Sequence, residues 1–413
     1  MATKYVNVDR QTPMLLPPDL RDWVAGNDLA HFVLEAVEST DLGAARVNVR
    51  GTGNAQYPPA MMLALLIYSY ATGTFSSRAM ERASHDSMAV RYLCANHHPD
   101  HDTIAGFRRE NGLLLKSCFV RVLELAREVG LLKLGTVSVD GTKIAARAGK
   151  KRNLTREQLA AELRRLEGEV NGLLARAEAE DRQGSDDGTS LPQELADRTR
   201  RLEQLRRAQR ALDERQGKQR RPQAGNDAVH PGEPDSALMR TAQGPFVQGY
   251  NAQAAVTAEG TTLIVGAHVV AEANDRRQLV PTIEAIPGQL GRPAIVLADT
   301  GYDHGEQIQE LTQRAIRVYC PPQNVAAQAP EPSRGQQRQD IWQQRCARQR
   351  EFEQAQVQQC YARRCASSEP CFHVIKRLMG FGRFLLRGLK KVNLEWDLVA
   401  LAYNCRKIAQ ATA

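Results

Sequence analysis

The stretch Thr136-Val137-Ser138-Val139-Asp140-Gly141 decides the fold of this 413-residue chain. It alternates with a period of two and stops at Gly141, which is typical of a β-strand that delivers a carboxylate at its end. A second apolar run, residues 294–298, ends in the same way at Asp299. Either acid alone would as readily be a turn former or a helix cap. Because a carboxylate at the end of a buried strand must be paired or bound to a metal ion, the two together indicate a shared metal site.

Further strands are expected on the carboxyl side of this stretch, at residues 247–256, 262–270 and 316–320. Apolar strands that alternate with helices indicate an α/β sheet covered on both faces. We therefore predict an α/β domain built from residues 132–152 and 246–413.

The first strand is followed by a long interruption with a heptad pattern. Its apolar residues step by four and three, as in a coiled-coil seam: Leu159, Leu163, Leu166, Val170, Leu173 and Ala177. Thr155 and Gln158 form a capping box for this helix, and a second heptad helix begins near Leu191. The pattern predicts a helical hairpin over residues 153–217, inserted after the first strand, and residues 218–245 are expected to form an exposed linker.

Residues 1–131 are expected to form an all-α domain of short helices. Asn27-Asp28 caps one helix, Pro58-Pro59 starts an apolar helix that Gly73 ends, and Pro99 leads into a long helix from Ile104 through Val129. The module carries four arginines, Arg78, Arg82, Arg108 and Arg109. Both a helix-turn-helix DNA reader and an ordinary helical bundle are compatible with this pattern.

Charge is concentrated near the carboxyl terminus. The chain has a net charge of +8, and residues 361–413 hold ten Lys and Arg against three acids. This surplus suits a polyanion such as DNA or an acidic membrane face, although a solvated basic helix is the simpler alternative. Arg383, Arg387, Lys390 and Lys391, placed on a basic helix, are expected to hold phosphates.

Several classes of protein are not favoured. The longest apolar stretch, residues 60–71, is too short to cross a bilayer, and the amino terminus has no secretory pattern. The eight cysteines include no C-x-x-C pair, and no phosphate-binding Gly-x4-Gly-Lys loop is present, so we expect no nucleotide cofactor. The spacing of Cys94, His97, His98 and His101 matches no common zinc pattern. A cytoplasmic, nucleoid-associated protein is the expectation.

A third acid, Glu369, lies in a helical segment near the basic end. Glu369 and Lys376 are seven residues apart and share a helix face, and Pro370 suits the first turn of a helix. A surface helix with a scattered acid is the alternative interpretation. Carboxylate oxygens are the ligands that Mg2+ or Mn2+ prefers.

Over nearly its whole length the chain resembles the bacterial insertion-sequence transposases of the DDE type, which carry a Y-R-E-K signature. The shared blocks are YPPAMMLALLIYSYATGTFSSRAME, PDHDTIAGFRR, VSVDGTKI, PDSALMRTAQGPFVQGYNAQAAV, LADTGYD and EPCFHVIKRLMGFGRFLLRGLKKVNLEW. The resemblance implies an RNase H-like catalytic domain. It assigns the metal ligands to Asp140, Asp299 and Glu369, and active-site DNA contacts to Tyr361, Arg364 and Lys376.

The implied activity is metal-dependent cleavage and strand transfer of DNA in a two-metal site. Terminal inverted repeats and target DNA would be the partners, and two copies would form a homodimer in a synaptic complex. A non-catalytic or decayed DNA-binding relative is one alternative, and an RNase H-like nuclease without strand transfer is another.

The signature departs from its commonest form. The gap from Arg364 to Glu369 is one residue longer, and Ser368 and His373 stand where relatives have an apolar residue and a glycine. Two other acids are expected to be structural: Asp275 as a helix N-cap, and Glu395 beside Trp396.

Overall fold

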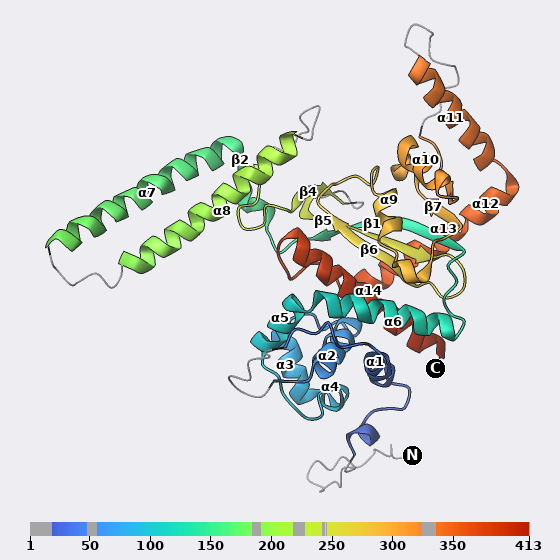
Figure 1. Cartoon of the computed structure of the whole chain (residues 1–413), viewed down its shortest axis with the longest axis horizontal. Coiled ribbons are helices and arrows are strands. Elements are labelled where there is room, and N and C mark those ends of the chain that lie inside the picture. The colour runs from blue at the N-terminus through green and yellow to red at the C-terminus, as the bar shows by residue number, and fades with distance from the viewer. Residues whose placement is uncertain are drawn as a thin grey trace, which may run out of the picture.

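The computed structural model describes residues 19–47, 56–183, 191–217, 228–241, 244, 246–323 and 336–412. Its centre is a six-stranded mixed sheet (Figure 1). The strands are β1 (Thr136–Ala145), β4 (Ala237–Arg240), β5 (Phe246–Thr257), β6 (Ile264–Val270), β7 (Ile295–Ala298) and β8 (Arg317–Tyr319). β5 is antiparallel to β1 and β6, whereas β1, β7 and β8 run parallel. This is the arrangement of an RNase H-like domain, and the predicted fold class is confirmed.

The strand around Asp140 is longer than the sequence pattern indicates. β1 was expected to stop at Gly141, but its antiparallel pairing with β5 continues from Gly141↔Gln253 to Ala145↔Gly249. Its parallel pairing with β7, in contrast, ends at Val139↔Ala298. Asp140 and Asp299 each follow this last parallel pair, so the two acids lie side by side where β1 and β7 separate.

Helices cover both faces of the sheet (Figure 1). On one side lie α9 (Leu279–Glu284), α10 (Gly305–Gln313) and the turns η3 (Gly288–Leu290) and η4 (Thr300–Tyr302). On the other lie α13 (Arg363–His373), the π-helical turn η6 (Val374–Leu378) and α14 (Leu389–Thr412). α11 (Gln336–Phe352) and α12 (Ala355–Tyr361) precede α13. Arg345 and Arg348 of α11 pair with the buried Asp303, at 3.5 and 2.7 Å.

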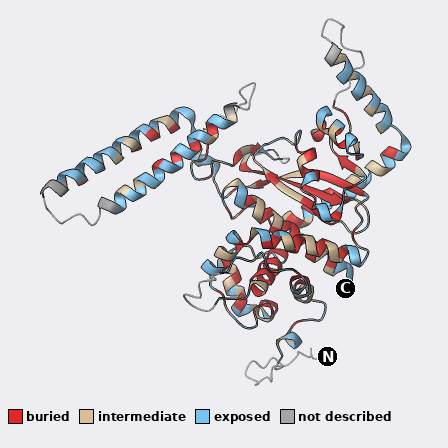
Figure 2. Ribbon diagram, viewed as in Figure 1, coloured by how far each residue is buried: buried red, intermediate tan, exposed pale blue. Residues whose placement is uncertain are grey.

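The helical hairpin follows β1 as predicted and projects from the sheet domain (Figure 1). It consists of α7 (Arg156–Gln183) and α8 (Leu191–Gly217), with η2 (Lys150–Arg152) and the two-stranded ribbon β2 (Leu154–Thr155) and β3 (Ala228–Val229) at its root. The two helices share a small apolar core of their own, and the rest of their surface is largely exposed (Figure 2). The capping box is confirmed: Gln158 N donates to Thr155 Oγ1, and Thr155 N to Gln158 Oε1.

The prediction of an exposed linker is wrong for residues 228–241. This segment forms β3 and β4, and its His230, Glu233 and Ser236 are buried. The polar composition misled because two of these residues bond within the fold: Ser236 Oγ donates to Glu233 O and accepts from Gln248, and Glu233 accepts from Tyr250. Residues 218–227, 242, 243 and 245 of the predicted linker lie outside the described residues.

The amino-terminal part is helical, as predicted. It comprises η1 (Leu20–Trp23), α1 (Leu29–Glu38), α2 (Pro59–Ala71), α3 (Ser77–Asp86), α4 (Met88–Leu93), α5 (His101–Glu110) and α6 (Gly112–Glu128). Asp28 caps α1, since it accepts from Ala30 N at 2.8 Å. The expected single helix from Ile104 to Val129 instead divides at Asn111, whose Oδ1 accepts from Arg46 N. No helix in the described ranges is both long and apolar enough to span a bilayer.

α14 joins the two parts of the molecule. It packs against α2 and α6 on one side and β6 on the other, and one continuous apolar core runs through all of them. The prediction of a basic carboxyl-terminal helix is therefore wrong, because α14 is largely buried. Arg383 and Arg387 precede this helix, and Lys390 and Lys391 lie in its first turn. The middle of α14 is mostly apolar and buried, and its cations lie toward the two ends, Lys390 and Lys391 at the start and Arg406 and Lys407 near the end.

Glu395 of α14 holds this junction together. Its fully buried carboxylate accepts from Tyr70 Oη at 2.8 Å and from the backbone N–H of Leu385 and Leu386 at 2.9 Å each. Arg108 donates to the same Tyr70 hydroxyl at 3.0 Å. Glu395 is structural, as expected, and the buried Arg108 is not available to DNA.

We expect Tyr70→Phe to lower the free energy of unfolding by about 2 kcal/mol, because it removes a hydrogen bond to a buried carboxylate. Urea unfolding followed by circular dichroism measures the change. Tyr319→Phe is the control, since the Tyr319 hydroxyl has no hydrogen-bond partner within the described residues, and it should shift the transition much less. Equal effects of the two variants would contradict the proposed role of the Glu395 junction.

Candidate functional site

The site is built where β1 and β7 separate. Asp140 lies on β1, with its side chain on the face that α13 covers, and its Oδ1 accepts from Gly141 N at 2.8 Å. Asp299 begins the turn η4 directly after β7, and its Oδ1 accepts from Gly301 N at 2.9 Å. The two carboxylates thus come together because each directly follows the last parallel pair between β1 and β7.

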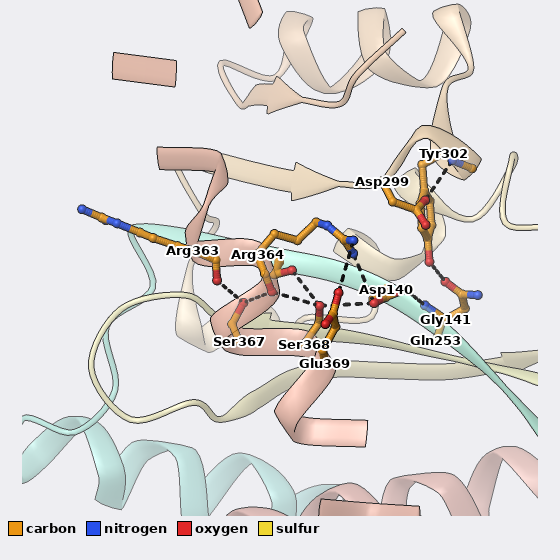
Figure 3. Close-up of polar contacts among 12 residues, drawn as sticks. Asp140, Gly141, Gln253, Asp299, Tyr302, Arg363, Arg364, Ser367, Ser368 and Glu369 are labelled. Carbon is orange, nitrogen blue, oxygen red and sulfur yellow. Dashed lines mark hydrogen bonds and ion pairs between the residues drawn. The ribbon is translucent and has the colours of Figure 1, made fainter. Parts of the chain in front are cut away.

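α13 brings a cation to these acids. Arg364 Nη1 lies 3.3 Å from Asp140 Oδ2, and Arg364 Nη2 lies 3.7 Å from Glu369 Oε1 (Figure 3). One turn after Arg364, Ser368 donates from Oγ to Asp140 Oδ2 at 3.2 Å. The guanidinium is only 13% exposed, so solvent screens the Asp140 contact weakly.

Burial controls the protonation of the acids. It raises the pKa of Asp140 to about 6, although the Gly141 N–H and the Arg364 guanidinium oppose the shift. Burial also raises the pKa of Asp299, and Arg364 again opposes it. The negative charge of Asp299 adds to the rise at Asp140. Two desolvated carboxylates close to each other favour a bound cation, and Arg364 supplies part of that charge.

Glu369 lies at the rim of this arrangement. Its side chain is 59% exposed and contacts the site only through Arg364. The residue one helical turn after Arg364 is Ser368, which is fully buried against Asp140. Pro370 was expected in the first turn of a helix but lies inside α13, which begins seven residues earlier at Arg363.

The remaining predicted DNA contacts fall into two groups. Tyr361 lies beside Arg364, whose charge opposes the burial that raises the tyrosine pKa. Lys376 donates to Lys143 O at 3.2 Å on the same side of the molecule. The other four, Arg383, Arg387, Lys390 and Lys391, are exposed; three of these, Arg387, Lys390 and Lys391, line a cavity with Arg207 of the hairpin.

A polar cluster that the sequence did not indicate lies on the opposite face of β1. Asp275 Oδ1 accepts from Asn251 Nδ2 at 2.7 Å and from Gln253 Nε2 at 2.6 Å, and it lies 3.5 Å from Lys143 Nζ. Asp275 is therefore not the helix N-cap that we expected; that position belongs to Gln278. The one sequence signal for this cluster was Lys143, which lies three residues after Asp140 in the VDGTK block.

Gly141 makes room for this cluster. A Cβ at this position would lie 2.2 Å from Gln253 Nε2 and 2.6 Å from Asp275 Oδ1. The glycine after Asp140 is thus required by packing across the sheet rather than by the turn that the sequence suggested.

The donor atoms suit a hard divalent cation. Asp140 and Asp299 offer partly buried carboxylate oxygens, and carboxylate oxygens are the ligands that Mg2+ and Mn2+ prefer. Across the described residues, no three acidic, histidine or cysteine side chains are gathered tightly enough to form a ready metal site. Arg364 lies between Asp140 and Glu369, so the structure brings Asp140 and Asp299 together and leaves Glu369 apart from them.

Comparison with known proteins gives two family matches. A model described as "Transposase domain (DUF772)" matches residues 18–110, and one described as "Transposase DDE domain" matches residues 228–405. Asp299 and Glu369 lie inside the second match, whereas Asp140 precedes it. No curated protein and no solved structure matches the chain.

The raised pKa of Asp140 predicts a pH dependence of stability. Between about pH 4 and 6 the folded protein binds more protons at Asp140 than the unfolded chain does, so stability falls as the pH rises. In EDTA, wild type should lose up to about 3 kcal/mol over this window relative to Asp140→Asn. Chemical unfolding at a series of pH values measures this, with exposed Asp86→Asn as the control. Parallel curves for wild type and Asp140→Asn would contradict it.

Proposed function

The chain belongs to the transposases with a DDE domain, and we propose that it cuts DNA strands at the ends of an insertion sequence and joins them to target DNA. The observation that carries this proposal is the pair of partly buried carboxylates, Asp140 and Asp299, which follow the last parallel pair of β1 and β7, with Arg364 of α13 beside Asp140. Such a pair suits phosphoryl transfer, which the family performs.

Asp140, Asp299 and Glu369 would hold the metal ions. When bound there, two Mg2+ or Mn2+ ions would activate the attacking hydroxyl and stabilise the departing 3′ oxygen. The protein contributes a rigid edge: both aspartates are fixed by backbone N–H donors, so their oxygens keep one position. Glu369 would reach the ions by a small rotation of α13 or of its own exposed side chain, whose ion pair with Arg364 is long, at 3.7 Å.

The cations around the acids would hold the DNA backbone. Arg364 and Lys143 flank the aspartates on opposite faces of β1, and both are drawn to carboxylates in the absence of DNA. Burial lowers the pKa of Lys143 and of Lys376, so a phosphate would favour their charged forms. These contacts supply affinity and orientation, not sequence choice.

Recognition of terminal repeats would come from the amino-terminal helices. Arg78, Arg82 and Arg109 are exposed on α3 and α5, and Arg108 is not. The Glu395 junction ties these helices to α14, so DNA held by α3 and α5 would be oriented relative to the acids. A homodimer would place two such ends in one synaptic complex.

A DNA-binding protein without catalysis is the second candidate. The observation in its favour is the exposed position of Glu369, with Ser368 occupying the place nearest to Asp140. A nuclease that cuts without joining would differ only in its products.

We expect wild type with Mg2+ to nick a duplex that carries an element end and to join the freed 3′-OH to a plasmid. Asp140→Ala and Asp299→Ala should lower both rates by at least about 100-fold, because each removes a metal ligand. Gel analysis of nicked and joined products measures both steps. Arg176→Ala, on the exposed hairpin, is the control.

The outcomes separate the three functions. Cleavage without joined products would identify a nuclease, and DNA binding without cleavage by wild type would favour the non-catalytic protein. Glu369→Gln tests the third acid: a rate equal to that of wild type would show that Glu369 is not a ligand.

Metal binding has a readout that does not depend on activity. At pH 8 we expect Mg2+ or Mn2+ to raise the unfolding temperature of wild type, because a cation offsets the repulsion between Asp140 and Asp299. Asp140→Asn should show much less of this rise, and EDTA should reverse it. Equal rises in both proteins would place the metal elsewhere. Differential scanning fluorimetry provides the measurement.

A further inference from the structure

A pocket lies at the root of the helical hairpin, away from the acids. Its volume is about 440 Å3, and we name it the hairpin-root pocket. It is lined by Arg147, Ala148, Gly149, Lys150, Lys151, Arg152, His230 and Arg387. Five of these side chains are cations and none is an acid, so the pocket has a strongly positive potential.

The five cations have no ion-pair partners among the described residues. Arg147 donates a single weak hydrogen bond, to Leu385 O at 3.3 Å, and all five are exposed. Along the hairpin itself the pattern differs, since many of its arginines pair with acids. Examples are Arg156–Asp213, Arg165–Glu169 and Arg206–Glu167. The root therefore concentrates cations that form no ion pair with the described residues.

His230 gives the pocket a buried polar group. It is only 9% exposed, and neither of its ring nitrogens has a hydrogen-bond partner. Burial and the charges of Arg387 and Arg152 lower its pKa, so the ring is neutral and presents one N–H. A buried donor without a partner is unfavourable unless a ligand accepts from it. An anion between the cations would satisfy it.

Arg387 also lines a second cavity, with Arg207, Lys390 and Lys391. That cavity also holds two acids, which accept from the protein: Tyr250 Oη donates to Glu233 at 3.1 Å, and Leu389 N donates to Asp235 at 2.9 Å, while Glu233 Oε2 has no hydrogen-bond partner among the described residues. The two cavities form one basic surface from η2 across Arg387 to α8. An extended polyanion fits this surface better than a single small ion does.

We propose that the hairpin-root pocket and its neighbouring cavity bind the phosphates of a DNA duplex, and that the inserted hairpin contributes this second DNA contact. The inference rests on the proposed function, because it assumes a DNA substrate. It gives the insertion a role in holding DNA beside the catalytic edge, since β1 carries Asp140 and leads directly into Arg147 and η2.

The test measures binding of a fluorescein-labelled duplex of arbitrary sequence by anisotropy over a range of NaCl concentrations. Each lost phosphate contact should lower the slope of log K against log salt by about 0.9. We expect Lys151→Ala/Arg152→Ala to lower it by about 1 to 2, and Arg387→Ala by about 1. Arg176→Ala, an exposed cation far along α7, should leave it unchanged. Circular dichroism verifies that each variant is folded.

The inference is overturned if wild type binds DNA with a steep salt dependence and the root variants keep the same slope. Failure of wild type to bind any duplex would instead defeat the proposed function itself. Inorganic phosphate provides the third arm, compared with chloride at equal ionic strength. If phosphate stabilises wild type more than the Lys151/Arg152 variant while the DNA slopes stay equal, the pocket is a small-anion site and the DNA inference is wrong.

Discussion

The organisation of the site depends on one electrostatic constraint, the burial of the Asp140 carboxylate. Asp140 lies where the parallel pairing of β1 and β7 ends, beside a second partly buried acid, and desolvation raises the pKa of both. Arg364 of α13 offsets the charge of Asp140, because its guanidinium lies 3.3 Å from the Asp140 carboxylate on the face of the sheet that α13 covers. The same constraint explains why Ser368 points inward and why Lys143 and Asp275 pair on the other face. A divalent cation would take over the role of Arg364 and leave the guanidinium to a phosphate.

α14 makes this edge rigid. Its Asn393 side chain bonds the backbone N–H and C=O of Val269 on β6, and its Asn404 side chain does the same with Ile264. These bonds cover the edge of β6, which would otherwise be open. Trp396 on the same helix donates to Gln253 O, next to the polar cluster around Asp275. Because Glu395 links α14 to Tyr70 of α2, the amino-terminal helices and the acids are parts of one packed body. DNA bound to one part is therefore held in a fixed relation to the other.

The sequence predicted most of the elements because their signals are local. Period-two alternation located β1 and β5, heptads located the hairpin, and capping residues located α1 and α7. What it did not predict depends on contacts between distant segments. β1 continues past Gly141 because β5 pairs with it, and much of the 228–241 segment is buried because β4, Glu233 and Ser236 bond to β5. α14 is buried although its first turn is basic. Asp275 resembles a helix cap in sequence and instead accepts from two residues of β5, which only the assembled sheet reveals.

Helix geometry determines where the third acid, Glu369, lies relative to the two aspartates. Successive residues of an α-helix are separated by about 100°, so the residue four after Arg364 shares its face and the residue five after it does not. Ser368 occupies the first position and Glu369 the second, which is why the serine contacts Asp140 and the glutamate is exposed. Pro370 cannot donate to the carbonyl one turn earlier, and α13 then passes into the π-helical turn η6. Both features weaken the helix next to Glu369, where a change of register would turn its side chain toward the two aspartates. The role that we propose for Glu369 therefore depends on the register of α13, whereas the sheet fixes Asp140 and Asp299.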